Sequence, residues 1–301
     1  MTAAGVPSSR YLSSIPASPA ISSAVQRVLG YIDDLPAGAT GALNFGLHGM
    51  ILLQSRKICW AVARTMRLRL SDLLRNQSTP PVSREAVEEV YRRCKSSGTP
   101  IGEALVASGL ATEAGLRAAL FKHNGDAIVA LARAGAAPDD WVTHTKPGYD
   151  PKYSFSACEV LAMVGALDDP ARAAAAQVEL ASMLVADSVG AAFTRGTDAS
   201  GALVIAVDRG CDFAVADLVG TCNWVAGLFD VAQTFDQEVF AARVHFGTQA
   251  GLVTWRSTDV GYVGMCGSRA AAARLVSRLS ERGVRASGVM PRGSHERESP
   301  A

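Results

Sequence analysis

The feature that most constrains the fold is a change of hydrophobic period within one segment, residues 203–229, LVIAVDRGCDFAVADLVGTCNWVAGLF. Its first part is a short aliphatic run that stops at Asp208-Arg209-Gly210, as a strand does at a turn. Beyond the turn, apolar residues recur at helical spacing: Val215, Leu218, Cys222, Val225 and Phe229. The segment therefore predicts a strand that turns directly into a long helix, with Asp212 as a candidate N-cap.

Cys211 lies at this predicted junction of strand and helix and is the best candidate nucleophile in the chain. A thiol at a helix N-terminus can have a lowered pKa, which would favour the reactive thiolate. The adjacent Asp212 would oppose that negative charge, and His245 as a general base has no support from spacing. We therefore favour an inert, buried thiol over a catalytic one.

The segments around this junction predict the remaining elements of the C-terminal half. A helix is expected over 171–187, strands over 189–196 and 202–208, three more strands over 239–246, 250–256 and 260–266, and a last helix over 268–283. Strand 239–246 alternates apolar and polar residues, which is typical of a half-buried strand. Ser268 is the expected N-cap of the last helix, and Gly283 follows its end. The predicted order is α-β-β-α-β-β-β-α.

The rest of the chain divides by composition and period. Residues 1–20 and 287–301 lack periodicity and are expected to be tails. Residues 21–135 form a mixed α/β and helical module that contains a helix near 20–35, a tight hairpin over 50–63 and four further helices up to 135. Residues 136–170 hold three prolines before a short helix and are expected to connect this module to the domain at 171–286. The predicted fold class is α+β.

Charge and cysteine usage exclude some functional classes. The 301-residue chain has a formal net charge of +1, which argues against a global polyanion binder. Its six cysteines are scattered without a CxxC pair, as expected for reduced thiols in a cytoplasmic protein. The N-terminus has no signal-peptide core, and no uninterrupted apolar run reaches the roughly 18 residues that a membrane span needs. We therefore expect a cytoplasmic protein without a membrane span.

The C-terminal half resembles the roadblock (dynein light chain) family, over about residues 171–285. The similar features are the hairpin that ends in LVIAVDRG, the long middle helix DFAVADLVGTCNWVAGLF, and the ending VGYVGMCGSRAAAARLVSRL. The resemblance implies a profilin-like sandwich without catalytic residues. It further implies a protein that forms homodimers by joining sheet edges and pairing the middle helices, and that binds or regulates small Ras-like GTPases.

The N-terminal half, about residues 24–133, resembles the PATAN family of bacterial signalling modules. The similar segments are GMILLQSRKICWAVA and the following helical pair TPIGEALVASGLATEAGLRAALFKH. In place of the acidic-glycine turn usual in that family, this chain has Gln54-Ser55-Arg56-Lys57. Together, the two resemblances imply a non-catalytic bacterial signalling or scaffold protein that acts through protein–protein contact.

Sequence patterns of enzymes and cofactor sites are missing. The chain contains no GxxxxGK[ST] phosphate loop and no GxSxG nucleophile elbow. Its five histidines are scattered, so we expect no metal site and no cofactor. Gly261, Gly264 and Gly267 have GxxGxxG spacing, but they span a strand end, where close packing and a corner explain them better than a dinucleotide.

Two surfaces are candidate interaction sites. The first combines the middle helix with strand 239–246; its residues are Leu218, Cys222, Trp224, Val225, Phe229, Phe240, Arg243 and His245. The second is a basic patch between residues 56 and 95, a segment with ten basic and four acidic residues. Its first members are Arg56, Lys57, Arg64, Arg67, Arg69 and Arg75. We interpret the patch as a solvated face and expect no nucleic acid. A nucleic-acid-binding regulator and a small-ligand sensor remain the alternative functions.

Overall fold

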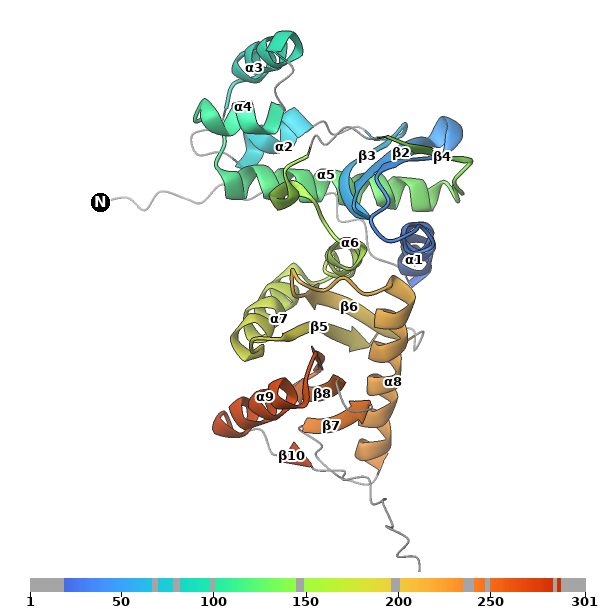
Figure 1. The fold of residues 1–301 in the computed structure, drawn as a ribbon, viewed down its shortest axis with the longest axis vertical. Coiled ribbons are helices and arrows are strands. Elements are labelled where there is room, and N and C mark those ends of the chain that lie inside the picture. The colour runs from blue at the N-terminus through green and yellow to red at the C-terminus, as the bar shows by residue number, and fades with distance from the viewer. Residues whose placement is uncertain are drawn as a thin grey trace, which may run out of the picture.

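A computed structural model describes residues 19–66, 70–77, 82–97, 101–144, 149–195, 201–234, 241–246, 250–283 and 286–287. The protein is mixed α+β, as the sequence predicts. Two sheet-containing blocks are stacked along the long axis of the molecule, with helix α6 between them (Figure 1). We call residues 19–144 the N-terminal block and residues 170–287 the C-terminal block. The predicted tails fall almost wholly outside the described residues.

The N-terminal block and the segment that follows it agree with most of the predicted elements. The helices and strands are α1 (Pro19–Asp33), β1 (Gly41–Asn44), η1 (Gly46–His48), β2 (Gly49–Gln54), β3 (Lys57–Ala63), α2 (Leu70–Gln77), α3 (Arg84–Ser97), α4 (Ile101–Ala107), α5 (Glu113–Arg133), β4 (Asp140–Thr143), η2 (Pro151–Tyr153) and α6 (Ala157–Gly165). β1 and β4 were not predicted. Both β4 and α6 come from residues 136–170, the segment expected to be a connector.

The C-terminal block has the predicted order of elements. They are α7 (Pro170–Met183), β5 (Ser188–Arg195), β6 (Ala202–Val207), α8 (Val215–Thr234), β7 (Ala241–Phe246), β8 (Ala250–Ser257), β9 (Val260–Cys266), α9 (Arg269–Glu281) and the short β10 (Ala286–Ser287). The α9 termini are as predicted, because the Ser268 side chain accepts a hydrogen bond from Ala271 N and Gly283 has a φ of 79°. Both ends of α9 are therefore specified locally.

The smaller sheet is antiparallel, with the strand order β3-β2-β1-β4. The predicted tight turn joins β2 to β3, and its central residues Ser55 and Arg56 have φ angles of 51° and 63°. Positive φ at both central residues is the type I′ geometry that matches the twist of a hairpin. β3 is an edge strand, but neighbouring segments cover it: Ile58 exchanges two backbone hydrogen bonds with Phe155, and Asn124 Oδ1 accepts one from Ala61 N.

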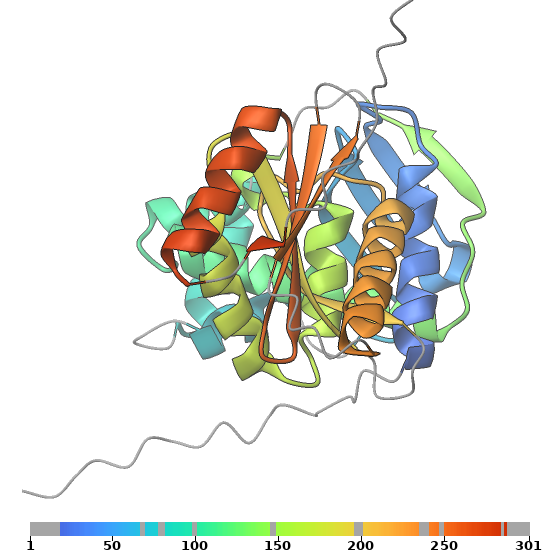
Figure 2. The ribbon, with the colours of Figure 1, turned by 90° about the horizontal axis from the view of Figure 1, so that it is seen from below.

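The larger sheet has the strand order β10-β7-β8-β9-β5-β6. α7 and α9 pack on one face through a cluster that includes Leu180, Leu275 and Trp255. α8 lies on the opposite face (Figure 2), where its buried residues join the main core. The C-terminal block therefore has three layers.

The three glycines with GxxGxxG spacing serve packing and a corner, as the sequence predicts. Gly261 and Gly264 lie in β9, where a Cβ atom would overlap the Phe193 ring and the Leu275 side chain. Gly267 lies in the turn after β9, where a Cβ atom would approach Asp187 too closely. Strand packing therefore explains the spacing.

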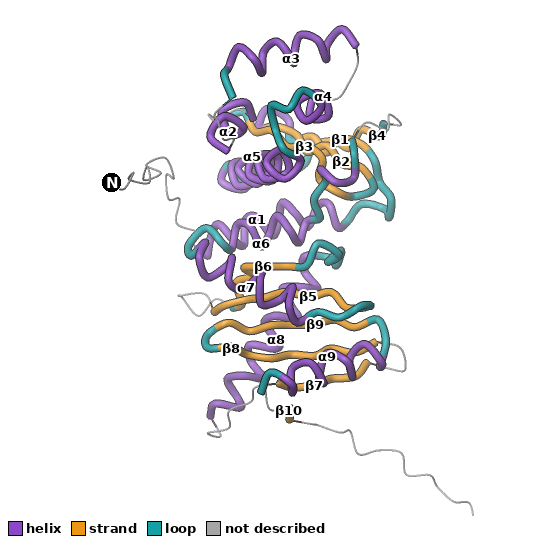
Figure 3. The backbone as a smooth tube through the Cα atoms, turned by 90° about the vertical axis from the view of Figure 1, so that its left-hand side faces the viewer, coloured by secondary structure: helices purple, strands orange, loops and turns teal. Residues whose placement is uncertain are grey.

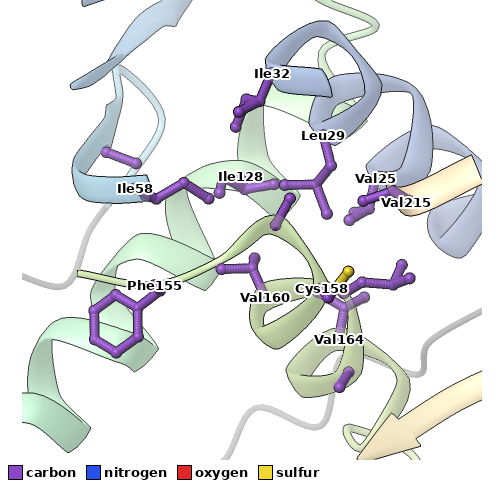
Figure 4. Packing of buried hydrophobic residues seen from close by; sticks show 14 of the residues in the cluster. Val25, Leu29, Ile32, Ile58, Ile128, Phe155, Cys158, Val160, Val164 and Val215 are labelled. Carbon is purple, nitrogen blue, oxygen red and sulfur yellow. The ribbon is translucent and has the colours of Figure 1, made fainter. Parts of the chain in front are cut away.

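The two blocks share one continuous hydrophobic core through α6. Buried residues of α1, α5, α6 and α8 meet there, among them Leu29, Ile128, Val160 and Val215 (Figure 4). α6 lies beside β6, the end strand of the larger sheet, in both views of the backbone (Figures 1 and 3). The segment expected to connect the blocks therefore also fills the space between them.

Candidate functional site

The junction between β6 and α8 is held by a residue from the other end of the chain. α8 begins at Val215, so Asp212 is too far upstream to cap it, and the predicted N-cap is wrong. Asp33, the last residue of α1, supplies the acceptor instead: its Oδ2 accepts a hydrogen bond of 2.6 Å from Val215 N. Its Oδ1 accepts a 3.3 Å hydrogen bond from Arg56 in the β2–β3 turn. One carboxylate thus joins α1, the hairpin and α8.

Burial dominates the electrostatics of Asp33. Burial raises the pKa of its carboxyl group above the ordinary value, and the hydrogen bond from Val215 and the charge of Arg56 oppose this shift without cancelling it. The Asp33 and Arg56 side chains are 13% and 30% exposed. The carboxyl group is therefore largely enclosed, with one oxygen held by Val215 N and the other by Arg56.

Three thiols gather beneath this junction: Cys158 of α6, Cys211, and Cys222 of α8. All three are buried, and Cys158 Sγ also donates a 3.2 Å hydrogen bond to Phe213 O. The hydrogen bond with Cys211, then burial, raises the pKa of Cys158, and burial raises that of Cys222. Since only the thiolate is nucleophilic, these two groups are held in their unreactive form. Cys211 is enclosed in the same cluster, which favours the inert interpretation.

The described residues contain no group of three or more His, Cys, Asp or Glu side chains placed to hold a metal ion. His245, considered as a base for Cys211, lies in β7, whose side chains are outside the described part of the structure. Among the side chains that the structure describes, the junction therefore offers packing and hydrogen bonds and no assembled acid–base pair.

The structure divides the predicted interaction residues of α8 between two faces. Leu218, Cys222, Val225 and Phe229 are buried in the core, because the face marked by their period packs on β6, β9, α1 and α6. Trp224 is 45% exposed on the opposite side. Phe240 lies outside the described residues. Arg243 and His245 belong to β7, where their backbones pair with Val253 and Gly251.

A second, outward face of α8 is also apolar, and the sequence analysis missed it. It contains Gly220, Trp224, Gly227, Leu228 and Val231, which at 100° per residue fall within an arc of about 100°. Val231 is 57% exposed, and the only charged residue within the same arc of α8 is Asp217, in the first turn of the helix. We call these five residues the outer face of α8. The sequence of α8 is apolar around most of the helix circumference. The spacing of the apolar residues alone therefore could not identify the side that faces solvent.

The outer edge of β7 lies close to the C-terminal end of α8 (Figure 1). β10 pairs with β7 only at Ala241 and Ala242, in parallel. Among the residues that the structure describes, Arg243 to Phe246 have no strand on that side. An unpaired strand edge next to an exposed apolar helix is a combination that favours pairing with another chain.

The predicted basic patch is only partly described. Arg56 is paired with Asp33, and Arg64 is exposed at the end of β3. Lys57 begins β3 and is half-buried. Arg67 and Arg69 lie outside the described residues, as does the side chain of Arg75. The described members are therefore one paired arginine, one half-buried lysine and one exposed arginine, and nucleic-acid binding stays an untested alternative.

The stretch Val215–Ala232 of α8 has a mean hydropathy of 1.2 with 33% of it buried, so its length and composition alone would allow it to cross a membrane. The core helix of a globular fold passes the same criterion. The search for an uninterrupted apolar run missed this stretch because Asp217 and Asp230 interrupt it.

No protein-family model matches the chain, and no curated protein matches it.

Proposed function

We propose that the protein is a non-catalytic signalling or scaffold protein that acts through protein–protein contact, and that it self-associates through the outer face of α8. The observation that carries this proposal is the exposure of Trp224, Leu228 and Val231 on one apolar stripe in the C-terminal half of α8. Contiguous exposed apolar surface of this kind typically marks an interaction site. A half-exposed tryptophan is also the residue type that most often dominates binding energy.

The two glycines of the outer face favour a helix as the contacting element. A Cβ atom at Gly220 or Gly227 would meet nothing within 4 Å, so neither glycine is needed for packing inside this chain. Small residues on a helix surface allow another backbone to approach closely, and Trp224 lies between the two glycines on the same stripe. A second copy of α8 presents the same protruding Trp224 and the same two glycines, so the two helices can pack with complementary shapes.

The open edge of β7 supports the same partner. β7 lies near the C-terminal end of α8 (Figure 1). We propose that a second copy, packed against the outer face by a two-fold axis, also places its own β7 at this edge. New hydrogen bonds along Arg243 to Phe246 would then satisfy backbone groups that the described strands leave open. We therefore propose a homodimer formed by α8 and β7 together.

Solution mass tests the proposal directly. Val231→Lys places a charge on the outer face, whereas Val178→Lys makes the same change on α7, where the valine is 71% exposed. We expect light scattering to give a dimer for the unaltered chain and for Val178→Lys, and a monomer for Val231→Lys with unchanged circular dichroism. The proposal is wrong if the unaltered chain stays monomeric at high concentration, or if the Val231→Lys variant is still a dimer.

The partner class follows from the resemblance to the roadblock family, which the order of elements in the C-terminal block supports. We propose that the dimer binds a small Ras-like GTPase and thereby passes on a signal without catalysing a reaction. A pull-down from the native cell with the chain as bait tests this step. We expect a small GTPase to be recovered with the unaltered chain and not with an unrelated bait, and its absence from both would contradict this assignment while leaving the dimer intact.

A further inference from the structure

A groove of about 560 Å³ lies on the side of the molecule where the two blocks meet. Helices α5, α6 and α7 and the end of β6 supply its lining residues. Its lining is mainly apolar and includes Ala118, Phe121, Met163, Ala174 and Ile205. Pockets that bind small organic molecules typically have volumes of about 300–1,000 Å³ and largely apolar walls. The groove therefore has the size and the lining of a ligand site.

The buried polar groups of the groove are already satisfied by the chain itself. Arg117 Nη2 donates a 2.7 Å hydrogen bond to Glu159 Oε1, and Arg117 Nη1 donates to the carbonyl oxygens of Lys152 and Ser154. The guanidinium group also lies 4.4 Å above the centre of the Phe155 ring. Since Glu159 neutralises Arg117, this end of the groove is a fixed wall and offers little attraction to a charged ligand.

Arg209 is the remaining charged residue of the lining. It follows β6 in the turn that leads to α8, and its side chain is exposed. Within the described part of the chain it forms no ion pair or hydrogen bond through its side chain. The lining thus carries one paired cation, one paired anion and one unpaired cation. The unpaired guanidinium group is a suitable partner for a single carboxylate, which it can bind through two parallel hydrogen bonds.

We propose that this groove binds an amphiphilic monocarboxylate, with its apolar chain against the alanine and phenylalanine walls and its carboxylate on Arg209. Both ends of such a ligand suit the groove. Burying the aliphatic chain against the apolar wall is favourable, and the carboxylate neutralises the exposed charge of Arg209. This site is distinct from the outer face of α8, so it does not depend on self-association. The proposal adds a ligand to a protein whose proposed function is contact alone.

The position of the groove gives the ligand a further effect. α5 belongs to the N-terminal block and α7 to the C-terminal block, so a bound molecule contacts both. A ligand that binds only this arrangement stabilises it by mass action. We therefore expect saturating ligand to raise the melting temperature of the full chain.

Calorimetric titration of the full chain with decanoate, decanol and decylamine, each below its micelle concentration, tests the proposal. We expect decanoate to bind more tightly than decanol, and decylamine to bind most weakly. Arg209→Gln should weaken decanoate roughly tenfold, the order expected for one lost charge-assisted hydrogen bond, and should leave decanol unchanged. Arg133→Gln, which removes an exposed arginine outside the groove, is the matched control and should bind as the unaltered chain does.

A steric variant separates the groove from any other apolar surface. Ala174 lines the groove and is exposed, whereas the neighbouring exposed Ala175 does not line it. We expect Ala174→Trp to abolish decanoate binding and Ala175→Trp to preserve it. Equal affinity for decanoate and decanol, an unchanged affinity in Ala174→Trp, or no heat of binding from any of the three compounds would overturn the proposal. None of these outcomes bears on the dimer, which is tested by mass.

Discussion

Asp33 offers the sharpest test of how the two blocks are held together. Replacing it with alanine removes the acceptor for Val215 N at the start of α8 and the partner of Arg56 in the hairpin. Val215 is buried, so its backbone N–H would lose its acceptor in a place with little access to water. The variant therefore removes a helix cap and an ion pair with one substitution.

The expected loss of stability can be worked from these two contacts. A lost N-cap costs about 1 kcal/mol, and up to about 2 kcal/mol where the donor is buried. The ion pair with the partly exposed Arg56 adds about 0–1 kcal/mol. The sum is about 2 kcal/mol for Asp33→Ala. Asp33→Asn keeps one acceptor oxygen for Val215 N and loses the ion pair with Arg56, so it should lose less, about 1 kcal/mol.

Urea denaturation followed by circular dichroism measures these differences. The adjacent, exposed Asp34 provides the matched control, and Asp34→Ala should stay within about 0.5 kcal/mol of the unaltered chain. We expect the free energy of unfolding to decrease in the order Asp34→Ala, Asp33→Asn, Asp33→Ala. If Asp33→Ala and Asp34→Ala unfold at the same urea concentration, the carboxylate does not hold the junction.

Three further predictions concern the core. Burial lowers the pKa of His123, so as the pH falls below 6.5 the unfolded state takes up a proton before the folded state does. We therefore expect the free energy of unfolding to drop between pH 7 and pH 5, and His123→Phe to remove this drop, as measured by urea denaturation at both pH values. Phe229→Ala should cost about 3–5 kcal/mol and Trp224→Ala less than about 1 kcal/mol in the monomer, and similar values would contradict the assignment of inner and outer faces. Gly165→Ala should lower the melting temperature by several degrees, because its Cβ atom would overlap Val204 O, and an unchanged melting temperature would show that α6 can move away from β6 at no cost.

Elements with local signals could be predicted from the sequence. The Ser268 cap and the Gly283 end of α9 are adjacent to the helix that they define, and both were found. The hairpin of β2 and β3 has a polar turn between two apolar runs, which is also a local pattern. β4 is only four residues long and mostly exposed, so it has neither the alternation nor the burial that would mark it, and pairing with β1 alone makes it a strand.

The candidate sites depend on contacts that the sequence does not reveal. The cap of α8 comes from Asp33, 182 positions before Val215, whereas local reasoning could only propose Asp212. The period of α8 correctly identified one continuous face, but that face is the core. Leu228 and Val231 form the exposed face because α1 and α6, which are distant in sequence, occupy the opposite side. Long-range packing thus decides which apolar residues are available to a partner.

The covering of β6 by α6 sets a limit on how the larger sheet can grow. Asn223 Oδ1 accepts a hydrogen bond of 2.6 Å from Ala202 N, and α6 lies against the rest of that strand. Among the described strands, the open edge of this sheet is therefore at its other end, formed by Arg243 to Phe246 of β7 and by the two-residue β10. A sheet with one open edge can join a second copy only edge to the same edge, so the proposed assembly would close at two and would not extend into a filament. Displacing α6 would create a second open edge, and the proposed pair could then extend into a polymer.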